Sequence, residues 1–330
     1  MIAAASAQEG AGQTVRERIR ERVEQRRAKP PAVTEPSPAT AFLAGDQVRT
    51  LAHGGQQRRY LIHVPPGLDQ SRPAPLVVAL HGGGGHAEYM ADDSRYGLIG
   101  AADRNGFIVV FPNGDSRFPG GRLATWNAGG CCGEARDSEI DDVGFVRAVV
   151  ADVRAGLRID PARIFATGMS NGAMMSYRLA CEAADLFRGI AAVAGTEAVA
   201  HCHPARAVAV LHIHARNDTH VLFSGGAGED AFRDRSKVMD FVSVPETVAR
   251  WVSRNQCRPA PRRTPEVPGA YCERYEGCRA GGEVQLCVTE AGGHSWPGAR
   301  TVRRGNEAAS TALDANSVIW AFFADLSTAR

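Results

Sequence analysis

The stretch RIFATGMSNGAMMSYRLAC, residues 163–181, decides the fold. Its first seven residues are typical of a buried strand, and the residues after Ser170 are typical of a helix. A sharp strand-to-helix turn with the pattern Gly-x-Ser-x-Gly exposes a serine hydroxyl to a general base and to backbone N–H groups that can hold an oxyanion. The pattern also suits a glycine-rich turn with an incidental serine. Because a strand precedes it and a helix follows it, we expect Ser170 to be a nucleophile.

Strand-like and helix-like stretches alternate on both sides of this turn. Several strand-like runs are continuously apolar, which is typical of strands buried on both faces. The predicted strands cover residues 58–64, 74–81, 107–112, 163–169, 189–195, 207–215 and 284–290. The predicted helices cover residues 92–105, 142–156, 172–182, 245–255 and 316–325. This order predicts an α/β fold with a mostly parallel sheet and helices on both faces.

The run HGGGG, residues 81–85, directly follows a predicted strand. In hydrolases with a serine on such a turn, one oxyanion donor is the N–H after the nucleophile and another comes from a glycine-rich loop. Here these donors would be Asn171 and either Gly82 or Gly83. A phosphate-binding loop is the alternative, but neither its Gly-Lys-Ser/Thr ending nor a complete dinucleotide-binding pattern is present.

An acid and a base follow the serine along the chain. Asp218 stands just after the predicted strand 207–215, where open α/β sheets build their sites, although an Asn-Asp pair is also common in turns. His294 lies after the last predicted strand, within GGHSWPG. The order Ser, Asp, His is the one found on the α/β-hydrolase scaffold. We therefore predict an α/β-hydrolase fold with Ser170, Asp218 and His294 as catalytic residues.

The other histidines raise the alternative of a zinc site. The candidates are His201, His203, His212, His214 and His220. His212 and His214 alternate along a strand and share one face, but no helical His-Glu-x-x-His spacing or Cys-x-x-Cys pair accompanies them. We expect packing and loop roles for these side chains and no metal ligands.

The overall composition limits the possible partners. Hydrophobic residues make up 44% and charged residues 22%, an ordinary globular balance, and the net charge of +2 gives no reason to expect nucleic acid or an acidic partner. No apolar run approaches the roughly 20 residues that span a bilayer, so we expect no membrane span.

The eight cysteines favour an oxidising compartment. The pairings we favour are Cys181 with Cys202, Cys257 with Cys278, and Cys272 with Cys287, although spacing leaves other pairings open. Cys131 and Cys132 are adjacent, and their state stays open.

The N-terminal region differs from the rest of the chain. Residues 1–7 resemble the end of a secretory signal, with a disordered Ala-rich terminus as the alternative. Residues 8–41 combine a charged helix with a Pro-rich linker, so the catalytic domain is expected over 42–330. We expect a secreted protein, extracellular or periplasmic.

Within the domain, residues 225–239 are loop-like and could cap a site.

Five segments together resemble one family. HGGGG, WNAGGCCG, DDVGF, GMSNGAMMSYRLAC and GGHSWPG are similar to those of the polyhydroxybutyrate depolymerase-like and feruloyl esterase group of α/β-hydrolases, related to carbohydrate esterase family 1. The resemblance covers roughly residues 58–323. One departure is that Ala215 and Leu222 replace a glycine and a proline around the acid.

The resemblance implies a secreted serine esterase that cleaves short acyl, hydroxybutyrate oligomer or feruloyl esters through an acyl-enzyme. The substrate would be a small ester or an oligomeric or polysaccharide-linked ester, without a metal or an organic cofactor. Trp126 and Trp296 flank motif segments and could bind an aromatic substrate, or could anchor loops or the core. The alternatives are a peptidase or thioesterase on the same scaffold, and a non-catalytic carbohydrate-binding homologue.

Overall fold

The computed structural model describes residues 42–231, 234–264, 267–279, 281–302 and 307–328. The signal-like segment 1–7 and the charged helix and linker 8–41 lie outside the described residues. The structure of the domain therefore begins at Phe42.

Within the described residues, ten strands form one sheet in the order β1-β2-β4-β3-β5-β6-β7-β10-β9-β8. The strands are β1 (Gly45–His53), β2 (Gln56–Val64), β3 (Ala74–Leu80), β4 (Ile108–Pro112), β5 (Ile159–Met169), β6 (Gly189–Val193), β7 (Ala209–Ala215), β8 (Arg262–Arg263), β9 (Ala270–Tyr275) and β10 (Val284–Thr289). The six strands from β4 to β10 in this order pair in parallel, and the strands at both edges pair antiparallel. The predicted α/β-hydrolase fold with a mostly parallel sheet is confirmed.

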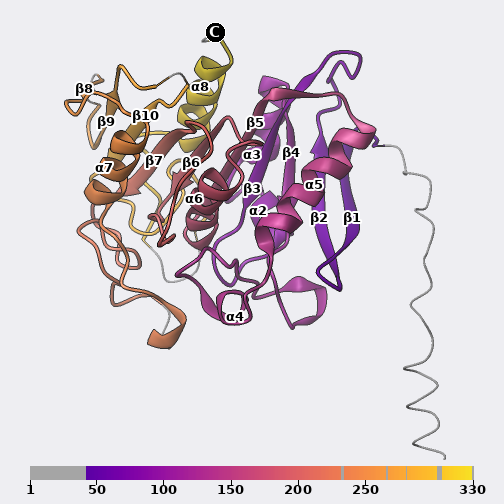
Figure 1. Cartoon of the computed structure of the whole chain (residues 1–330), viewed down its shortest axis with the longest axis horizontal. Helices are drawn as coiled ribbons and strands as arrows, with labels where there is room; N and C mark the ends of the chain where they lie inside the picture. The colour runs from indigo at the N-terminus through magenta and orange to yellow at the C-terminus, as the bar shows by residue number, and fades with distance from the viewer. Residues whose placement is uncertain (1–41, 232–233, 265–266, 280, 303–306, 329–330) are drawn as a thin grey trace, which may run out of the picture. The chain divides into compact units, whose positions relative to one another are not determined.

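Helices cover both faces of the sheet (Figure 1). They are α2 (Ala87–Ala91), α3 (Leu98–Asn105), α4 (Gly133–Asp137), α5 (Asp142–Gly156), α6 (Asn171–Glu182), α7 (Val244–Arg254) and α8 (Ala315–Thr328), with short 3₁₀ turns over Pro119–Gly121 and Arg235–Lys237. On one face, α5, α6 and α7 pack with Leu76 and Val78 of β3. On the other, α2, α3 and α8 pack with Val77 and Ala79. Alternate side chains of β3 thus enter two separate cores.

The predicted elements are present, together with five that were not predicted, and one predicted helix begins later than expected. The sequence patterns missed the edge strands β1, β8 and β9 and the short helices α2 and α4. The helix expected from residue 92 begins at Leu98 instead. Before it, Gly97 is left-handed, and Asp93 accepts hydrogen bonds from the backbone N–H groups of Ile99 and Gly100. These bonds keep residues 92–97 in a turn. None of the helices in the described part of the chain is both long and apolar enough to cross a bilayer.

All eight cysteines are paired. The bonds are Cys181–Cys202, Cys257–Cys278 and Cys272–Cys287, which are the predicted pairs, and Cys131–Cys132. Cys272 and Cys287 stand directly opposite each other on the antiparallel strands β9 and β10. This bridge therefore fastens the strand that ends just before the loop containing His294.

Candidate active site

Ser170 occupies the turn between β5 and α6 in a backbone conformation that non-glycine residues rarely adopt. Its φ is 57° and its ψ is −123°. Its N–H donates to the Val193 carbonyl, and its carbonyl accepts from the Met174 N–H. Strained residues of this kind persist only where their surroundings fix them, and they are concentrated at functional sites. The turn predicted from the motif is present.

The motif glycines are required by close packing around this turn. A methyl group on Gly168 would lie 2.5 Å from the backbone of Gly172, and one on Gly172 would lie 2.2 Å from the Leu80 carbonyl oxygen. Gly195, which the sequence analysis did not single out, is equally constrained, because its methyl group would lie 2.3 Å from the Ser170 carbonyl oxygen. Side chains at these positions would displace the serine turn from β3 and from the segment after β6.

His294 and Asp218 form a hydrogen-bonded pair, 76 residues apart in the chain. The Nδ1 atom of His294 lies 2.8 Å from Oδ2 of Asp218. The other carboxylate oxygen accepts from the backbone N–H groups of His220, at 2.8 Å, and Val221, at 3.0 Å. Both side chains are buried. Burial alone would raise the pKa of Asp218, but the charge of His294 and the hydrogen bonds from His214 and His294 outweigh it and hold that pKa well below its usual range.

The glycine-rich loop after β3 is fixed by His81. Gly114 donates its N–H to Nε2 of this buried ring at 2.9 Å, so the proton is on Nδ1, which donates to the Gly82 carbonyl at 2.8 Å. Burial lowers the pKa of His81 to about 4, although the bond to Gly82 opposes this, so the ring stays neutral near pH 7. Because the peptide bond is planar and trans, fixing the Gly82 carbonyl also fixes the Gly83 N–H on its opposite side.

Trp126 supports this loop and does not line the cavity. Its side chain is fully buried, and its indole N–H donates to the His81 carbonyl at 2.9 Å. Its backbone N–H and carbonyl bind the amide side chain of Asn171 at 2.7 and 3.0 Å. The predicted contact of Trp126 with substrate is therefore wrong, and the loop-anchoring alternative describes its position.

One cavity of about 650 Å³ brings six of the predicted residues together, and Asp218 lies behind its wall, bonded to His294. The predicted residues in its wall are Gly82, Gly83, Ser170, Asn171, His294 and Trp296. Glu229, Asp230, Ala231 and Val238, from the loop expected to cap a site, also line it. In the turn after Asp218, Val221 lines the cavity. Leu222, which replaces a proline of the related sequences, does not.

One side of the cavity is aromatic. The rings of Tyr96 and Trp296 meet edge to face with centroids 5.5 Å apart, and Tyr89 meets Tyr96 at 6.0 Å. The Arg95 guanidinium covers Tyr89 at 4.6 Å from the ring centroid. Elsewhere the wall is mixed: Val221 and Phe241 are apolar, whereas Glu229 and Asp230 are acidic. The aromatic side therefore suits an apolar or aromatic substrate group.

The histidines considered for zinc do not converge on one point. His201 and His203 are exposed, whereas His212 and His214 are buried. His220 lies with Asp218 and His294 in a compact group of possible ligands. However, the rings of His220 and His294 are stacked, with centroids 4.3 Å apart and planes within 10°. Nitrogen lone pairs lie in the ring planes, so two parallel stacked rings are poorly placed to bind one ion.

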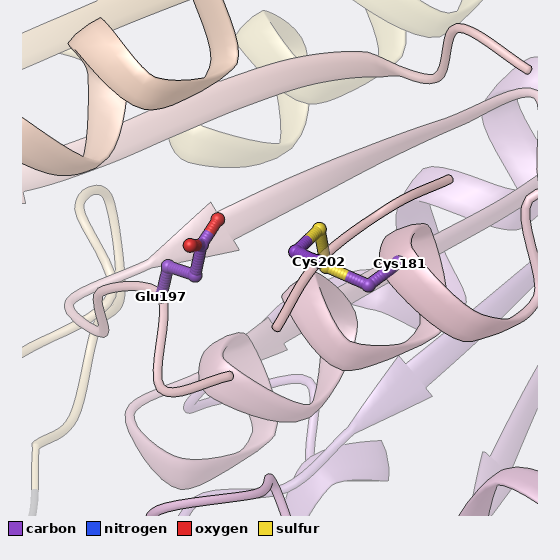
Figure 2. Close-up of side chains that lie close together, drawn as sticks. All are labelled: Cys181, Glu197 and Cys202. Carbon is purple, nitrogen blue, oxygen red and sulfur yellow. A yellow bond between two sulfur atoms is a disulfide. The ribbon is translucent and has the colours of Figure 1, made fainter. Parts of the chain in front are cut away.

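A second compact group contains Cys181, Glu197 and Cys202 (Figure 2). Both sulfur atoms are consumed in a disulfide, and metals bind the thiolate form of cysteine. The buried Glu197 carboxylate pairs instead with Arg254, at 2.9 Å from Nη2, and with Arg250 at 3.5 Å. These contacts tie the loop after β6 to α7 and indicate a structural role.

Two buried groups that support the site were missed by the sequence analysis. One is the His81 contact to the glycine loop. The other is Asp142, which pairs with the buried Arg58 guanidinium at 2.7 Å and accepts from the Asn127 N–H at 2.8 Å. The sequence did contain a signal for these contacts, because His81, Asn127 and Asp142 lie in the motifs HGGGG, WNAGGCCG and DDVGF.

With the sheet, the serine turn and the Asp–His pair established, the chain is an α/β-hydrolase. The family described as Esterase PHB depolymerase matches residues 58–239, and the chain belongs to this family of esterases. Feruloyl esterase B of Piromyces equi is 31% identical over 243 residues, which are 72% of this chain but only 42% of that protein. The chain thus matches less than half of that relative's length.

Two further comparisons concern the family and the fold. NocK of Nocardia uniformis subsp. tsuyamanensis, an esterase by name, is 32% identical over 269 residues, covering 76% of this chain and 74% of NocK. The acetyl xylan esterase from Aspergillus awamori has a similar structure, with a TM-score of 0.57 over 84% of this chain and 98% of that one, at 14% identity. At that identity the likeness concerns the fold alone.

Proposed function

We propose that this esterase is a secreted serine hydrolase that cleaves carboxylic esters through an acyl-enzyme on Ser170. The observation that supports this most strongly is the shared cavity: Ser170 in its strained turn and the His294 ring bonded to Asp218 both open into it. A serine and a histidine oriented by a carboxylate are the components of nucleophilic acyl transfer.

Each side chain then has a defined step. The Asp218 carboxylate accepts the Nδ1–H of His294, which leaves Nε2 free of a proton and able to take the one on the Ser170 hydroxyl. Ser170 attacks the ester carbonyl, and His294 returns the proton to the departing alcohol. Water, deprotonated by the same nitrogen, then attacks the acyl-enzyme and releases the acid and free Ser170.

The oxyanion of each tetrahedral intermediate needs backbone donors. Asn171 is the first residue of α6, so its N–H has no partner inside the helix. The Gly83 N–H is oriented by the bond that His81 makes to the Gly82 carbonyl. We assign the two donor roles to Asn171 and Gly83, with Gly82 beside them in the same wall.

For the substrate, we favour hydroxycinnamoyl esters such as feruloyl esters. The aromatic wall of Tyr89, Tyr96 and Trp296 offers edge and face contacts to a planar acyl group. The relative from Piromyces equi is named as a feruloyl esterase. A 3-hydroxybutyrate oligomer is the second candidate, because the matching family is described by PHB depolymerase.

The four disulfides support an extracellular or periplasmic location.

The substrate is tested by comparing kcat/KM for methyl ferulate and for a soluble 3-hydroxybutyrate dimer under identical conditions. A ratio well above one is expected, and a ratio well below one would assign hydroxyalkanoate oligomers. The matched amide of ferulic acid separates an esterase from a peptidase. Trp296→Ala provides an internal control, because it should raise KM for methyl ferulate more than for the dimer.

A further inference from the structure

A buried chain of hydrogen bonds reaches the acid through His214, in addition to the bond from His294. The Tyr177 hydroxyl lies 2.8 Å from Nδ1 of His212, and Nε2 of His212 lies 3.1 Å from Nδ1 of His214. Nε2 of His214 then lies 2.8 Å from the Val221 carbonyl oxygen and 3.3 Å from Oδ2 of Asp218. Tyr177, His212 and His214 are buried and none lines the cavity, so the chain has no direct contact with substrate there.

The direction of every proton in this chain is fixed by its last acceptor. A carbonyl oxygen can only accept, so Nε2 of His214 carries a proton, and in the neutral ring its Nδ1 then accepts. His212 must then donate from Nε2 and accept at Nδ1 from the Tyr177 hydroxyl. Both rings are neutral in this arrangement, and burial is consistent with it, since it lowers the pKa of His212 and raises that of Tyr177.

His214 therefore binds both ends of the turn that holds the acid. Asp218 accepts from the Val221 N–H, and the carbonyl of the same residue accepts from His214. The proton on His214 is shared between this carbonyl and Asp218, a three-centre arrangement in which the carbonyl is the closer acceptor. Oδ2 of Asp218 thus has one donor from His294 and a second from His214.

We propose that His214 is a positioning residue for the acid: its Nε2–H clamps the Asp218–Val221 turn and keeps Oδ2 of Asp218 aimed at the Nδ1–H of His294. This inference rests on the proposed function, since it presumes that Asp218 acts through His294. Without this clamp, the carboxylate could rotate about its side-chain bonds, and the imidazole would lose the orientation that its proton transfer requires.

Two substitutions separate positioning from simple core stability. The amide of His214→Asn ends near the position of Nδ1, so it can accept from His212 but does not reach Asp218. The amide of His214→Gln reaches the position of Nε2, so it can donate to Val221 and Asp218 but serves His212 poorly. Phe323→Leu, in α8 on the other face of the sheet, is the control for a loss of stability alone, because its ring packs against Phe165.

We expect His214→Asn to lower kcat about tenfold to a hundredfold, the range of a hydrogen bond to a charged group that acts in the transition state, with KM little changed. The kcat of His214→Gln should stay within about threefold of wild type, because its side chain keeps a donor at the position of Nε2. Phe323→Leu should lower the melting temperature and leave kcat unchanged. Wild-type kcat in His214→Asn, or equal losses in the Asn and Gln variants, would overturn the proposal.

A double-mutant cycle tests whether His214 acts through Asp218. In an Asp218→Asn background, His214→Asn should have little further effect on kcat, measured with an activated ester. The same fold loss in both backgrounds would contradict the proposal. A different experiment tests the proposed function itself: that function would be wrong if Ser170→Ala kept its activity. If His214→Asn does not fold, ¹⁵N NMR of the wild-type imidazoles decides: neutral His214 protonated on Nε2 supports the clamp, and protonation on Nδ1 overturns it.

Discussion

Oδ2 of Asp218 accepts from Nδ1 of His294 at 2.8 Å, and in the proposed mechanism this bond fixes which nitrogen of the imidazole serves Ser170. The carboxylate can serve this purpose because four donors hold it, two to each oxygen. Its low pKa keeps it charged at neutral pH. The predictions below follow from this arrangement and from the packing around it.

Asp218→Asn should lower kcat about ten-thousandfold, the size of effect seen when a triad carboxylate is replaced by its amide. The amide N–H would favour the imidazole tautomer with its proton on Nε2, which has no lone pair for the serine proton. Steady-state kinetics checks this expectation, and a circular dichroism spectrum like that of the wild type shows that the variant is folded. A loss of tenfold or less would remove Asp218 from the mechanism.

Two glycine substitutions should have opposite consequences. In Gly172→Ala the new methyl group would lie 2.2 Å from the Leu80 carbonyl oxygen, so we expect a marked loss of stability and little soluble protein. In Gly82→Ala it would lie 3.5 Å from Cβ of Ser170, an ordinary contact that the fold tolerates. This methyl group would occupy space beside Ser170, the proposed nucleophile, so activity should fall while the melting temperature changes little. Thermal melts and kcat/KM of both variants test the contrast.

Replacing both Cys181 and Cys202 by serine should lower the free energy of unfolding by about 3 kcal/mol, the chain-entropy value for a loop of this length. The bridge joins the end of α6 to the loop after β6, and neither cysteine lines the cavity. The kcat at 25 °C should therefore stay within about twofold of wild type. Urea unfolding and steady-state kinetics on one preparation test both parts, and a large loss of kcat would show that the bridge shapes the site.

Stability should fall in mildly acidic solution because His81 is buried as a neutral ring. Its pKa is about 4 in the folded protein against an ordinary 6.5, so the unfolded chain binds more protons between these values. Stability is therefore complete above about pH 6.5 and falls as the pH drops toward 4, by roughly 3 kcal/mol for this group. Urea unfolding at pH 7.5 and pH 5 should show a smaller difference in His81→Gln. If the stability difference between the two pH values is equal in the wild type and in His81→Gln, His81 is not the cause. His212 adds to the pH dependence in both proteins.

The central strands were predictable, but the edges were not. Strands β3 to β7 and β10 are apolar runs, and the side chains of β3 alternate between two cores. Strand β9 has the sequence AYCERY, whose charged residues give no buried pattern, and it forms because it can pair with β10 and bond Cys272 to Cys287. Strand β1 alternates between intermediate and exposed side chains, since only one face of this edge strand is covered.

The site residues were predictable as far as they belong to motifs in the order of a known scaffold. The buried side chains that hold these residues in place were not predictable. The spacing of His212 and His214 shows that they share a face of a strand, but the contacts of that face with Tyr177 on α6 and with the turn after Asp218 depend on tertiary packing. Trp126 was misassigned for the same reason, because its position in a motif does not reveal that its indole points to the His81 carbonyl.

The most direct test of the central claim is the rate of ester hydrolysis by Ser170→Ala, with fluorophosphonate labelling of the wild type followed by peptide mapping. We predict that the label is found on Ser170 and that the folded alanine variant has kcat about a million-fold lower than wild type. A folded Ser170→Ala variant that retains a tenth of the wild-type rate, or a label on another residue, would contradict the account.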